Sequence, residues 1–204
     1  MRNAPFRAAL VNAKPVACRR LFVGIALDAP TREALAKLSC ALESAGLTAR
    51  YELAEKLHVT LAFLGSVAED RIAPLTEALR GAVSGIEPFT VGFDVLGGFP
   101  KNSRTRIAWV GARKPVAGFA RLADAVRDTA RAFAKLDEKP AVLHVTLARL
   151  REPAALPSVS VKASTMRVAE VVLFESLPAG PTSRYEVVAR FPLTVHASSP
   201  DASK

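Results

Sequence analysis

Six consecutive residues, LHVTLA, occur twice in this chain, at 57–62 and again at 143–148. Two of the three histidines, His58 and His144, lie inside these copies. Each copy follows a Val-Gly pair and a helical pattern, and the spacing from Gly24 to His58 nearly matches that from Gly111 to His144. Self-similarity of this kind is typical of a duplicated structural unit. The repeat therefore predicts two copies of a β-α-β unit.

The apolar periodicity around the repeats indicates the secondary structure. Strands are expected at 20–27, 58–63, 89–96, 105–111, 144–150, 170–175 and 185–191, and helices at about 30–45, 69–83 and 116–133. Two repeats are too few for a solenoid. We therefore expect an α+β fold with two pseudo-twofold-related β-α-β lobes, mostly antiparallel sheets, and a central groove that carries both H-x-T motifs.

The ends of the chain differ in character from its middle. Residues 1–18 are basic and lack clear periodicity, which predicts a disordered extension; the apolar piece is too short for a signal peptide, while a transit peptide stays open. Residues 19–196 are expected to form a single bilobal domain whose duplicated units are interleaved. Residues 197–204 form a polar tail.

Composition limits the setting and the partners. No run of apolar residues is long enough for a membrane span, and two cysteines are too few for a disulfide framework. A cytoplasmic protein, monomeric by default, is expected. Lys and Arg number 28 against 19 Asp and Glu, a net charge of +9 that favours polyanionic partners such as nucleic acid. A basic surface that only aids solubility remains the alternative.

The H-x-T motif places its two polar side chains on the same face of a strand, because side chains alternate. On this pattern Phe63 falls on the opposite, apolar face, with Val59 and Leu61. By the same alternation, Arg149 would lie on the apolar face of its strand. Because an arginine does not fit there, we expect it near the strand end, turned toward the groove or toward solvent. A single strand histidine is usually structural, but the same costly polar pair kept twice indicates a shared site.

Two histidines that face one bound group can form an acid–base couple. Imidazole has a reference pKa near 6.5, so one copy can be neutral and the other protonated near neutral pH. The neutral ring can take a proton from water while the protonated ring gives one to a leaving oxygen. Threonine hydroxyls on the same face are suited to the oxygens of a tetrahedral anion. A phosphate ester is the implied substrate.

Other chemistries are less well supported by the sequence. A catalytic zinc usually has three protein ligands, but the third histidine, His196, lies near the end of the chain. Glu52, Glu55 and Asp137 could contribute to a metal site only from a distance. No nucleophile elbow and no glycine-rich phosphate loop is present. The site is therefore expected to hold no metal and no cofactor.

The motifs resemble those of the two-histidine phosphoesterase superfamily, and more narrowly RNA 2′,3′-cyclic phosphodiesterases, also called 2′-5′ RNA ligases. The resemblance covers nearly the whole folded chain and rests on RLFVGIALD, LHVTLAFLG, GGFPKNSRTRIAWVG, HVTLARL and LFESLPAGPTSRYEVVARFPL. It implies metal-independent hydrolysis of an RNA-terminal 2′,3′-cyclic phosphate to a 2′-phosphomonoester, with a weak, reversible ligase activity.

The resemblance also implies roles for individual residues. His58 and His144 would be the acid–base pair, Thr60 and Thr146 would bind the phosphate, and Arg149 would contact it. Phe99 would stack on the terminal base, although the sequence alone favours a core position for it. In the expected reaction His144 activates water and His58 protonates the leaving 3′-oxygen, and the two roles are exchangeable.

Two features depart from the family pattern. Tyr51 stands where relatives often have Trp, and Ala-Val-Leu precedes His144 where relatives often have Phe-x-Pro. The second difference bears on how the strand enters the groove and thus on substrate fit.

Two alternative functions remain: a module that binds RNA ends or nucleotides without turnover, and a two-histidine phosphoesterase that acts on small cyclic nucleotides.

Overall fold

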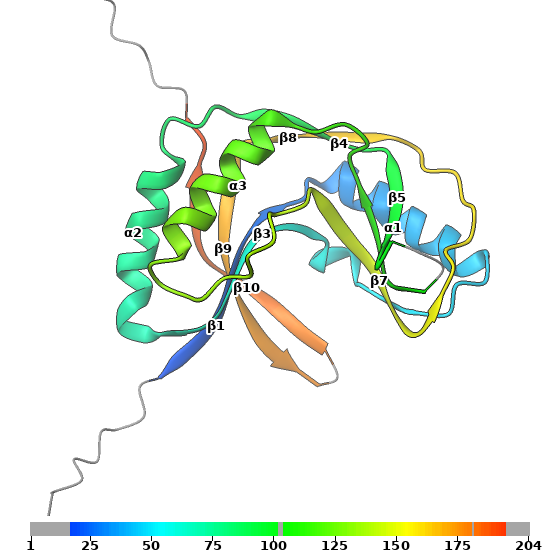
Figure 1. Cartoon of the computed structure of the whole chain (residues 1–204), viewed down its shortest axis with the longest axis horizontal. Helices are drawn as coiled ribbons and strands as arrows, with labels where there is room; N and C mark the ends of the chain where they lie inside the picture. Colours follow the sequence, from blue (N-terminus) through cyan, green and yellow to red (C-terminus); the bar gives the residue numbers. More distant parts are fainter. Residues whose placement is uncertain (1–16, 102–103, 181, 195–204) are drawn as a thin grey trace, which may run out of the picture.

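The computed structural model describes residues 17–101, 104–180 and 182–194 (Figure 1). In these ranges the chain forms three α-helices, two short 3₁₀ turns and ten strands. Their order is β1 (Cys18–Ala26), α1 (Ala29–Ser44), β2 (Arg50–Tyr51), η1 (Ala54–Lys56), β3 (His58–Ala68), η2 (Glu69–Arg71), α2 (Ile72–Val83), β4 (Phe89–Phe93), β5 (Val95–Phe99), β6 (Thr105–Gly111), α3 (Ala117–Ala130), β7 (His144–Ala154), β8 (Ser164–Val168), β9 (Glu170–Ala179) and β10 (Thr182–Pro192).

Most strands belong to one sheet, with the order β10-β9-β1-β3-β7-β6-β5, and β2 pairs with β7 outside this path. A second sheet contains β4 and β8. Each strand pairing in the described residues is antiparallel. The predicted α+β class with mostly antiparallel sheets is confirmed.

The two lobes meet where β3 pairs with β7. The one residue pair recorded between these strands joins Val59 to Val145, which are the same residue of the LHVTLA repeat. An antiparallel pair between equivalent residues lies on a local twofold axis. The predicted pseudo-twofold arrangement therefore has its axis between these two valines, and Figure 1 shows that β3 and β7 otherwise lie apart.

Helices from each half contact strands of the other half. Helix α3, which precedes β7 in the chain, packs against β3 and α2, while α1, which precedes β3, contacts β7 and β8. Leu122 and Val126 of α3 are fully buried, and so are Leu35 and Leu42 of α1. In the described residues the halves thus share one core rather than forming two separate cores.

Local sequence explains the limits of α1. The carboxylate of Asp28 accepts a hydrogen bond from the backbone N–H of Thr31 at 2.9 Å, and Pro30 occupies the first turn, where it needs no hydrogen-bond donor. The helix ends before Gly46, whose φ of 88° is the left-handed conformation favoured at helix ends. Both limits agree with the sequence pattern.

Three expectations need correction. The strand expected at 89–96 is two strands in different sheets, because β4 pairs with β8 whereas β5 pairs with β6. Strand β8 was not predicted, and residues 69–71 form a 3₁₀ turn before α2. The extension expected at 1–18 lies outside the described residues except for its last two, and Cys18 already begins β1. The tail expected at 197–204, and His196, lie outside them entirely.

Both repeated strands contain a register shift at the same residue. Gly24 pairs with Thr60 and Val23 with Ala62, which leaves Leu61 as the extra residue of β3. On β7, Trp109 pairs with Thr146 and Ala108 with Ala148, which leaves Leu147 extra. An extra residue of this kind, a β-bulge, reverses the face of the side chains that follow it.

The bulges correct the predicted position of Phe63. The sequence pattern placed this side chain on the apolar face, but it is 66% exposed and shares a cavity with His58 and Thr60. Arg149 is its counterpart in the second repeat and follows the same shift onto the face of His144. The misfit of Arg149 in the sequence pattern thus reflects a bulge and not the end of the strand.

Candidate active site

Both H-x-T motifs line one cavity of about 230 Å³, which we call the histidine pocket. The cavity lies over the place where β3 and β7 meet, so each repeat contributes the same pair of residues to it. The structure thus brings together five of the six residues singled out in the sequence. The lining is formed by Glu52, Lys56, His58, Thr60, Phe63, Ile107, His144, Thr146, Arg149 and Tyr185.

The strand register arranges the four repeated side chains around the pseudo-twofold axis. Because Val59 pairs with Val145 in antiparallel fashion, His58 lies across from Thr146, and Thr60 lies across from His144. The two histidines are then diagonal neighbours, for which a separation of about 7–8 Å is usual. Since both rings line the same cavity, a tetrahedral group bound there can reach both of them.

Both imidazole rings are held by the same backbone contact. Nδ1 of His58 lies 2.6 Å from the carbonyl oxygen of Lys56, and Nδ1 of His144 lies 2.9 Å from that of Val142. A carbonyl only accepts, so Nδ1 carries the proton and donates it in each ring. In both neutral rings Nε2 therefore bears the lone pair and is the atom left to act on a ligand.

Burial lowers the pKa of both histidines from the ordinary value of 6.5. The pKa of His58 is lowered further by the positive charges of His144 and Arg149, and it is raised in part by the Lys56 carbonyl and by Glu52. The pKa of His144 is raised by the Val142 carbonyl and lowered by Arg149. Of the two histidines, only His58 has its pKa raised by Glu52, so the electrostatic surroundings of the two rings differ.

Arg149 is oriented by a carboxylate. Its Nε donates to Oε1 of Glu52 at 3.0 Å, and the Glu52 side chain is only 18% exposed. The backbone N–H of Glu52 in turn donates to the carbonyl oxygen of Leu147 at 2.8 Å, which fixes this segment beside β7. Since Nε takes part in the ion pair, the two terminal nitrogens of the guanidinium remain available for an anion in the pocket.

Aromatic side chains flank each histidine. The ring of His58 contacts Phe22, with ring centroids 4.9 Å apart, and meets Tyr185 edge-on at 5.3 Å. The ring of His144 meets Phe99 edge-on at 5.3 Å and lies 6.1 Å from Trp109. These contacts limit the rotation of both imidazoles and exclude water from one side of each ring.

Phe99 lies beside the histidine pocket and not in its lining. It is half-buried and also packs against Trp109, with ring centroids 5.2 Å apart. Trp109 can lie over β5 because Gly97 faces it: a Cβ on Gly97 would come within 2.2 Å of the indole ring. Phe99 therefore packs against Trp109 and also lies next to the histidine pocket through its contact with His144.

Several residues in the histidine pocket, or in contact with its histidines, were not identified from the sequence. Tyr185 comes from β10, far along the chain, and reaches His58 only because β9 and β10 fold back beside β1. Phe22 precedes Val23-Gly24 and is the counterpart of Trp109, which precedes Val110-Gly111. An aromatic residue therefore precedes Val-Gly in both repeats, and this pattern could have identified Phe22 and Trp109, each of which contacts the histidine of its own half.

The donor set does not favour a metal. Within residues 17–101, 104–180 and 182–194, no group of three or more His, Cys, Asp or Glu side chains is placed to hold a metal ion. Glu52, considered above as a distant ligand, instead pairs with Arg149.

Among the described helices, none combines the length and the apolar character that crossing a membrane requires.

Comparison with protein families gives a match in both halves of the chain. The model described as LigT like Phosphoesterase matches residues 25–109 and again residues 110–185. Each match includes one of the two H-x-T motifs. The duplication inferred from LHVTLA is therefore found independently by the family model.

Curated proteins of three organisms show similarity along most of the chain, and all three are named RNA 2′,3′-cyclic phosphodiesterase. The Escherichia coli protein is 32% identical over 179 residues, covering 86% of this chain and 97% of its own. The Methanothermobacter thermautotrophicus protein is 29% identical over 79% of this chain and 93% of its own. The Geobacillus stearothermophilus protein is 30% identical over 84% of this chain, which spans only 56% of that relative.

Solved structures show the same fold. Escherichia coli LigT complexed with 3′-AMP matches with a TM-score of 0.71 and 29% identity, covering 87% of this chain and 99% of that one. Escherichia coli LigT complexed with phosphate matches with a TM-score of 0.67 and 31% identity, over 87% and 98% of the two chains. Both ligands, 3′-AMP and phosphate, contain a phosphoryl group.

Proposed function

The chain belongs to the LigT-like phosphoesterase family, and on this premise we propose that it hydrolyses RNA-terminal 2′,3′-cyclic phosphates to 2′-phosphomonoesters. The observation that carries the proposal is the pair of imidazoles in one pocket, each with Nδ1 held by a carbonyl and Nε2 left for a ligand. The names of the curated relatives support the same substrate class.

In the proposed reaction the two rings transfer protons on opposite sides of the phosphorus. Nε2 of neutral His144 takes a proton from water as the water oxygen attacks phosphorus in line. The bond from phosphorus to the ribose 3′-oxygen breaks, and Nε2 of protonated His58 gives that oxygen its proton. The products are a 3′-hydroxyl and a 2′-phosphomonoester, and proton exchange with solvent restores both rings.

The remaining polar groups of the pocket bind the phosphoryl oxygens. Within the described residues, the hydroxyls of Thr60 and Thr146 have no recorded hydrogen-bond partner, so both are available as donors. Arg149 adds a positive charge that Glu52 holds in place. Donors fixed before the reaction stabilise charge that develops in the transition state at no cost of reorganisation.

Phe99 is the proposed contact for the terminal base. Its edge-on contact with His144 places an aromatic side chain next to the space where the phosphate would bind. Stacking between a base and an aromatic side chain contributes roughly 1–3 kcal/mol. The contacts of Phe99 with Trp109 and His144 would keep the ring oriented for this role.

The same couple can promote ligation. If the 5′-hydroxyl of a second RNA replaces water as the nucleophile, attack on the cyclic phosphate with departure of the 3′-oxygen produces a 2′-5′ linkage. The proton transfers are unchanged, so the two reactions differ only in which hydroxyl occupies the position in line with the leaving oxygen.

The assignment of acid and base rests on Glu52. Its negative charge favours the protonated form of His58, whereas the pKa of His144 receives no such contribution. Because this charge opposes the lowering of the His58 pKa by burial, the proposal assigns the acid to His58 and the base to His144. The repeat makes the two rings similar, and Glu52 makes them different.

The pH profile of kcat/KM is expected to be bell-shaped with its maximum below pH 6.5. The acidic limb reports protonation of the base, the alkaline limb reports loss of the proton from the acid, and both belong to the free enzyme. Because the pKa of each histidine is lowered from 6.5, both limbs move to lower pH. A maximum clearly above pH 7 would contradict this placement. The measurement is kcat/KM on a cyclic-ended RNA across the pH range.

The variant Glu52→Gln tests the roles within that profile. Loss of the negative charge lowers the pKa of His58, so the alkaline limb should move to lower pH if His58 is the acid. The acidic limb should stay in place, because Glu52 is not among the groups that shift the pKa of His144. Movement of the acidic limb instead would exchange the two roles. Glu55→Gln, an exposed carboxylate outside the pocket, is the matched control.

The direct test of the function is a product analysis in the presence of a chelator. A short RNA ending in a 2′,3′-cyclic phosphate is incubated with the protein and excess EDTA, and the position of the product phosphate is mapped. A 2′-phosphate is the expected result. Recovery of unchanged RNA after long incubation with saturating protein would favour a binding module, and opening only after metal is added would refute the two-histidine mechanism.

A further inference from the structure

A larger cavity, of about 630 Å³, adjoins the histidine pocket, and we call it the outer cavity. It is lined by residues of β1, of β2 and of the β9–β10 hairpin. The reaction proposed above uses only the histidine pocket, so this second space needs its own explanation. Five residues line both cavities and make them continuous: Glu52, Lys56, Phe63, Arg149 and Tyr185.

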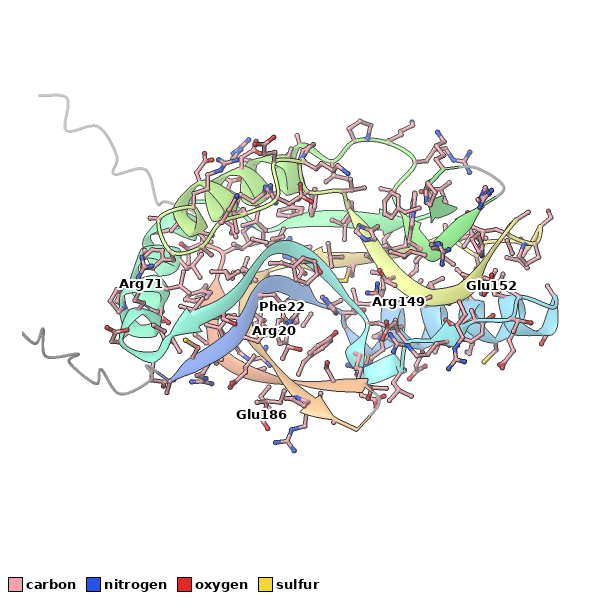
Figure 2. All side chains as sticks on the ribbon, turned by 60° about the horizontal axis from the view of Figure 1, so that its bottom comes forward. Arg20, Phe22, Arg71, Arg149, Glu152 and Glu186 are labelled. Atoms are coloured by element: carbon pink, nitrogen blue, oxygen red, sulfur yellow. The ribbon has the colours of Figure 1, made fainter. Side chains whose placement is uncertain are left out.

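The outer cavity is strongly cationic. Its lining contains Arg20, Arg50, Lys56 and Arg149 but only one carboxylate, Glu52, which already pairs with Arg149. No ion pair is recorded for Arg20 or Arg50 anywhere in the described chain. Figure 2 shows Arg20 on β1, next to the β9–β10 hairpin, and Arg149 on β7. A lining of this composition attracts an anion.

Two of these cations stand opposite each other in the sheet. Arg50 of β2 is the register partner of Arg149 of β7. Residues directly opposite in an antiparallel pair project to the same face, and like charges in that position are destabilising. The arrangement becomes favourable when an anion lies between the two guanidinium groups.

The outer cavity also presents apolar side chains to solvent. The described residues include four exposed large hydrophobic side chains, and two of them line this cavity: Phe63, 66% exposed, and Leu53, 54% exposed. A flat aromatic ring open to solvent beside several cations is typical of sites that bind single-stranded nucleic acid, where bases stack and phosphates pair. A free inorganic anion would leave both apolar side chains uncovered.

We propose that the outer cavity is a subsite for the nucleotide on the 5′ side of the cyclic-phosphate end. The inference rests on the proposed function and makes it more specific: the preferred substrate is an oligoribonucleotide of at least two residues, not a free nucleoside cyclic phosphate. The phosphate that links the last two nucleotides binds between Arg50 and Arg149, with Arg20 nearby, and the preceding base lies against Phe63.

The position of the cavity agrees with the chemistry of an RNA end. In a ribose the base is attached to C1′ and the 5′-carbon to C4′, so a cyclic phosphate between the two histidines with its base toward Phe99 would direct the 5′-oxygen away from the base. The outer cavity begins on that opposite side, at Phe63 and Tyr185. The hydroxyls of Ser176 and Ser183 on the hairpin line the same space and can bind a ribose 2′-hydroxyl.

The test compares cytidine 2′,3′-cyclic phosphate with a dinucleotide that ends in the same group. For the unmodified chain, kcat/KM for the dinucleotide should exceed that for the mononucleotide by about five- to 150-fold, the equivalent of one stacked base. Arg50→Ala should bring this ratio toward one, because Arg50 lines only the outer cavity and its contact is made only by the added nucleotide. Phe63→Leu, which removes the ring proposed to stack on the added base, should also lower the ratio. Arg121, an exposed residue of α3, lines neither cavity, so Arg121→Ala removes the same charge and should leave the ratio unchanged.

The outcomes separate this inference from the function on which it rests. Equal kcat/KM values for the two substrates would overturn the subsite while the proposed hydrolysis stands. So would a ratio that Arg50→Ala and Phe63→Leu both leave intact. Absence of opening for both substrates would refute the proposed function and the subsite with it. A second readout is the binding of a 2′-phosphate-ended oligomer, whose dependence of log K on log salt should weaken by about 0.7 in Arg50→Ala.

Discussion

Replacing His144 with alanine is expected to lower kcat for a cyclic-ended RNA by roughly 10²–10⁴-fold, the usual contribution of one positioned proton transfer. His58→Ala should cause a loss of similar size, because the two rings act in the same step from opposite sides of the phosphorus. The double variant should be little worse than either single variant, since residues that work as a unit are strongly non-additive. The measurement is kcat and KM for all three variants.

The expected loss must be separated from a loss of structure. Both histidines are half-buried and make one backbone hydrogen bond each, so the variants should keep their far-ultraviolet circular dichroism and cooperative unfolding. Binding of an oligomer that ends in a 2′-phosphate should also persist, because the threonines and Arg149 remain. Turnover retained by both single variants would refute the proposed mechanism.

Replacing Arg149 with methionine is expected to lower kcat by roughly 10²–10³-fold, the cost of removing one preorganised donor to developing charge. Methionine keeps much of the side-chain volume but removes the charge and leaves Glu52 without its partner. Arg149→Lys should recover only part of the activity, because Lys lacks the planar fork that can bind Glu52 and a phosphoryl oxygen together.

The pH profile gives this variant a second signature. Arg149 lowers the pKa of both histidines, so its loss raises both, and both limbs of the kcat/KM profile should move to higher pH. Arg151→Met is the matched control: it is an exposed arginine on the same strand that does not line the histidine pocket, and neither effect is expected for it. A kcat for Arg149→Met equal to that of the control would contradict the proposed role.

Most of the features that the pseudo-twofold axis relates could be predicted from the sequence. The repeated LHVTLA predicted the duplication, the two lobes and the shared face of each His and Thr, since strand alternation and the spacing from glycine to histidine follow directly from residue order. The structure places both motifs in one pocket around the Val59–Val145 pair. The side chains that this symmetry relates were therefore within reach of sequence reasoning.

The parts that sequence reasoning missed depend on register and on distant strands. A strict alternation assigned Phe63 to the core, but the bulge at Leu61 brings it to the ligand side, and no turn residue marks that bulge. The same shift at Leu147 places Arg149. Glu52 and Tyr185 reach the pocket through pairing of β2 with β7 and of β9 with β1, which local patterns do not determine.

The interleaved helices have a consequence for how the chain is made. Strand β3 is covered by α3, which follows it by about fifty residues, and β1, the first strand, is paired on one side with β9, near the other end of the chain. A ribosome therefore releases the His58 strand long before the elements that cover it have been synthesised. Contacts of such long sequence separation slow folding, and partly folded chains expose apolar strands that aggregate. Neither lobe can complete its core during synthesis, so the two histidine motifs should reach their final positions together, after most of the chain has left the ribosome.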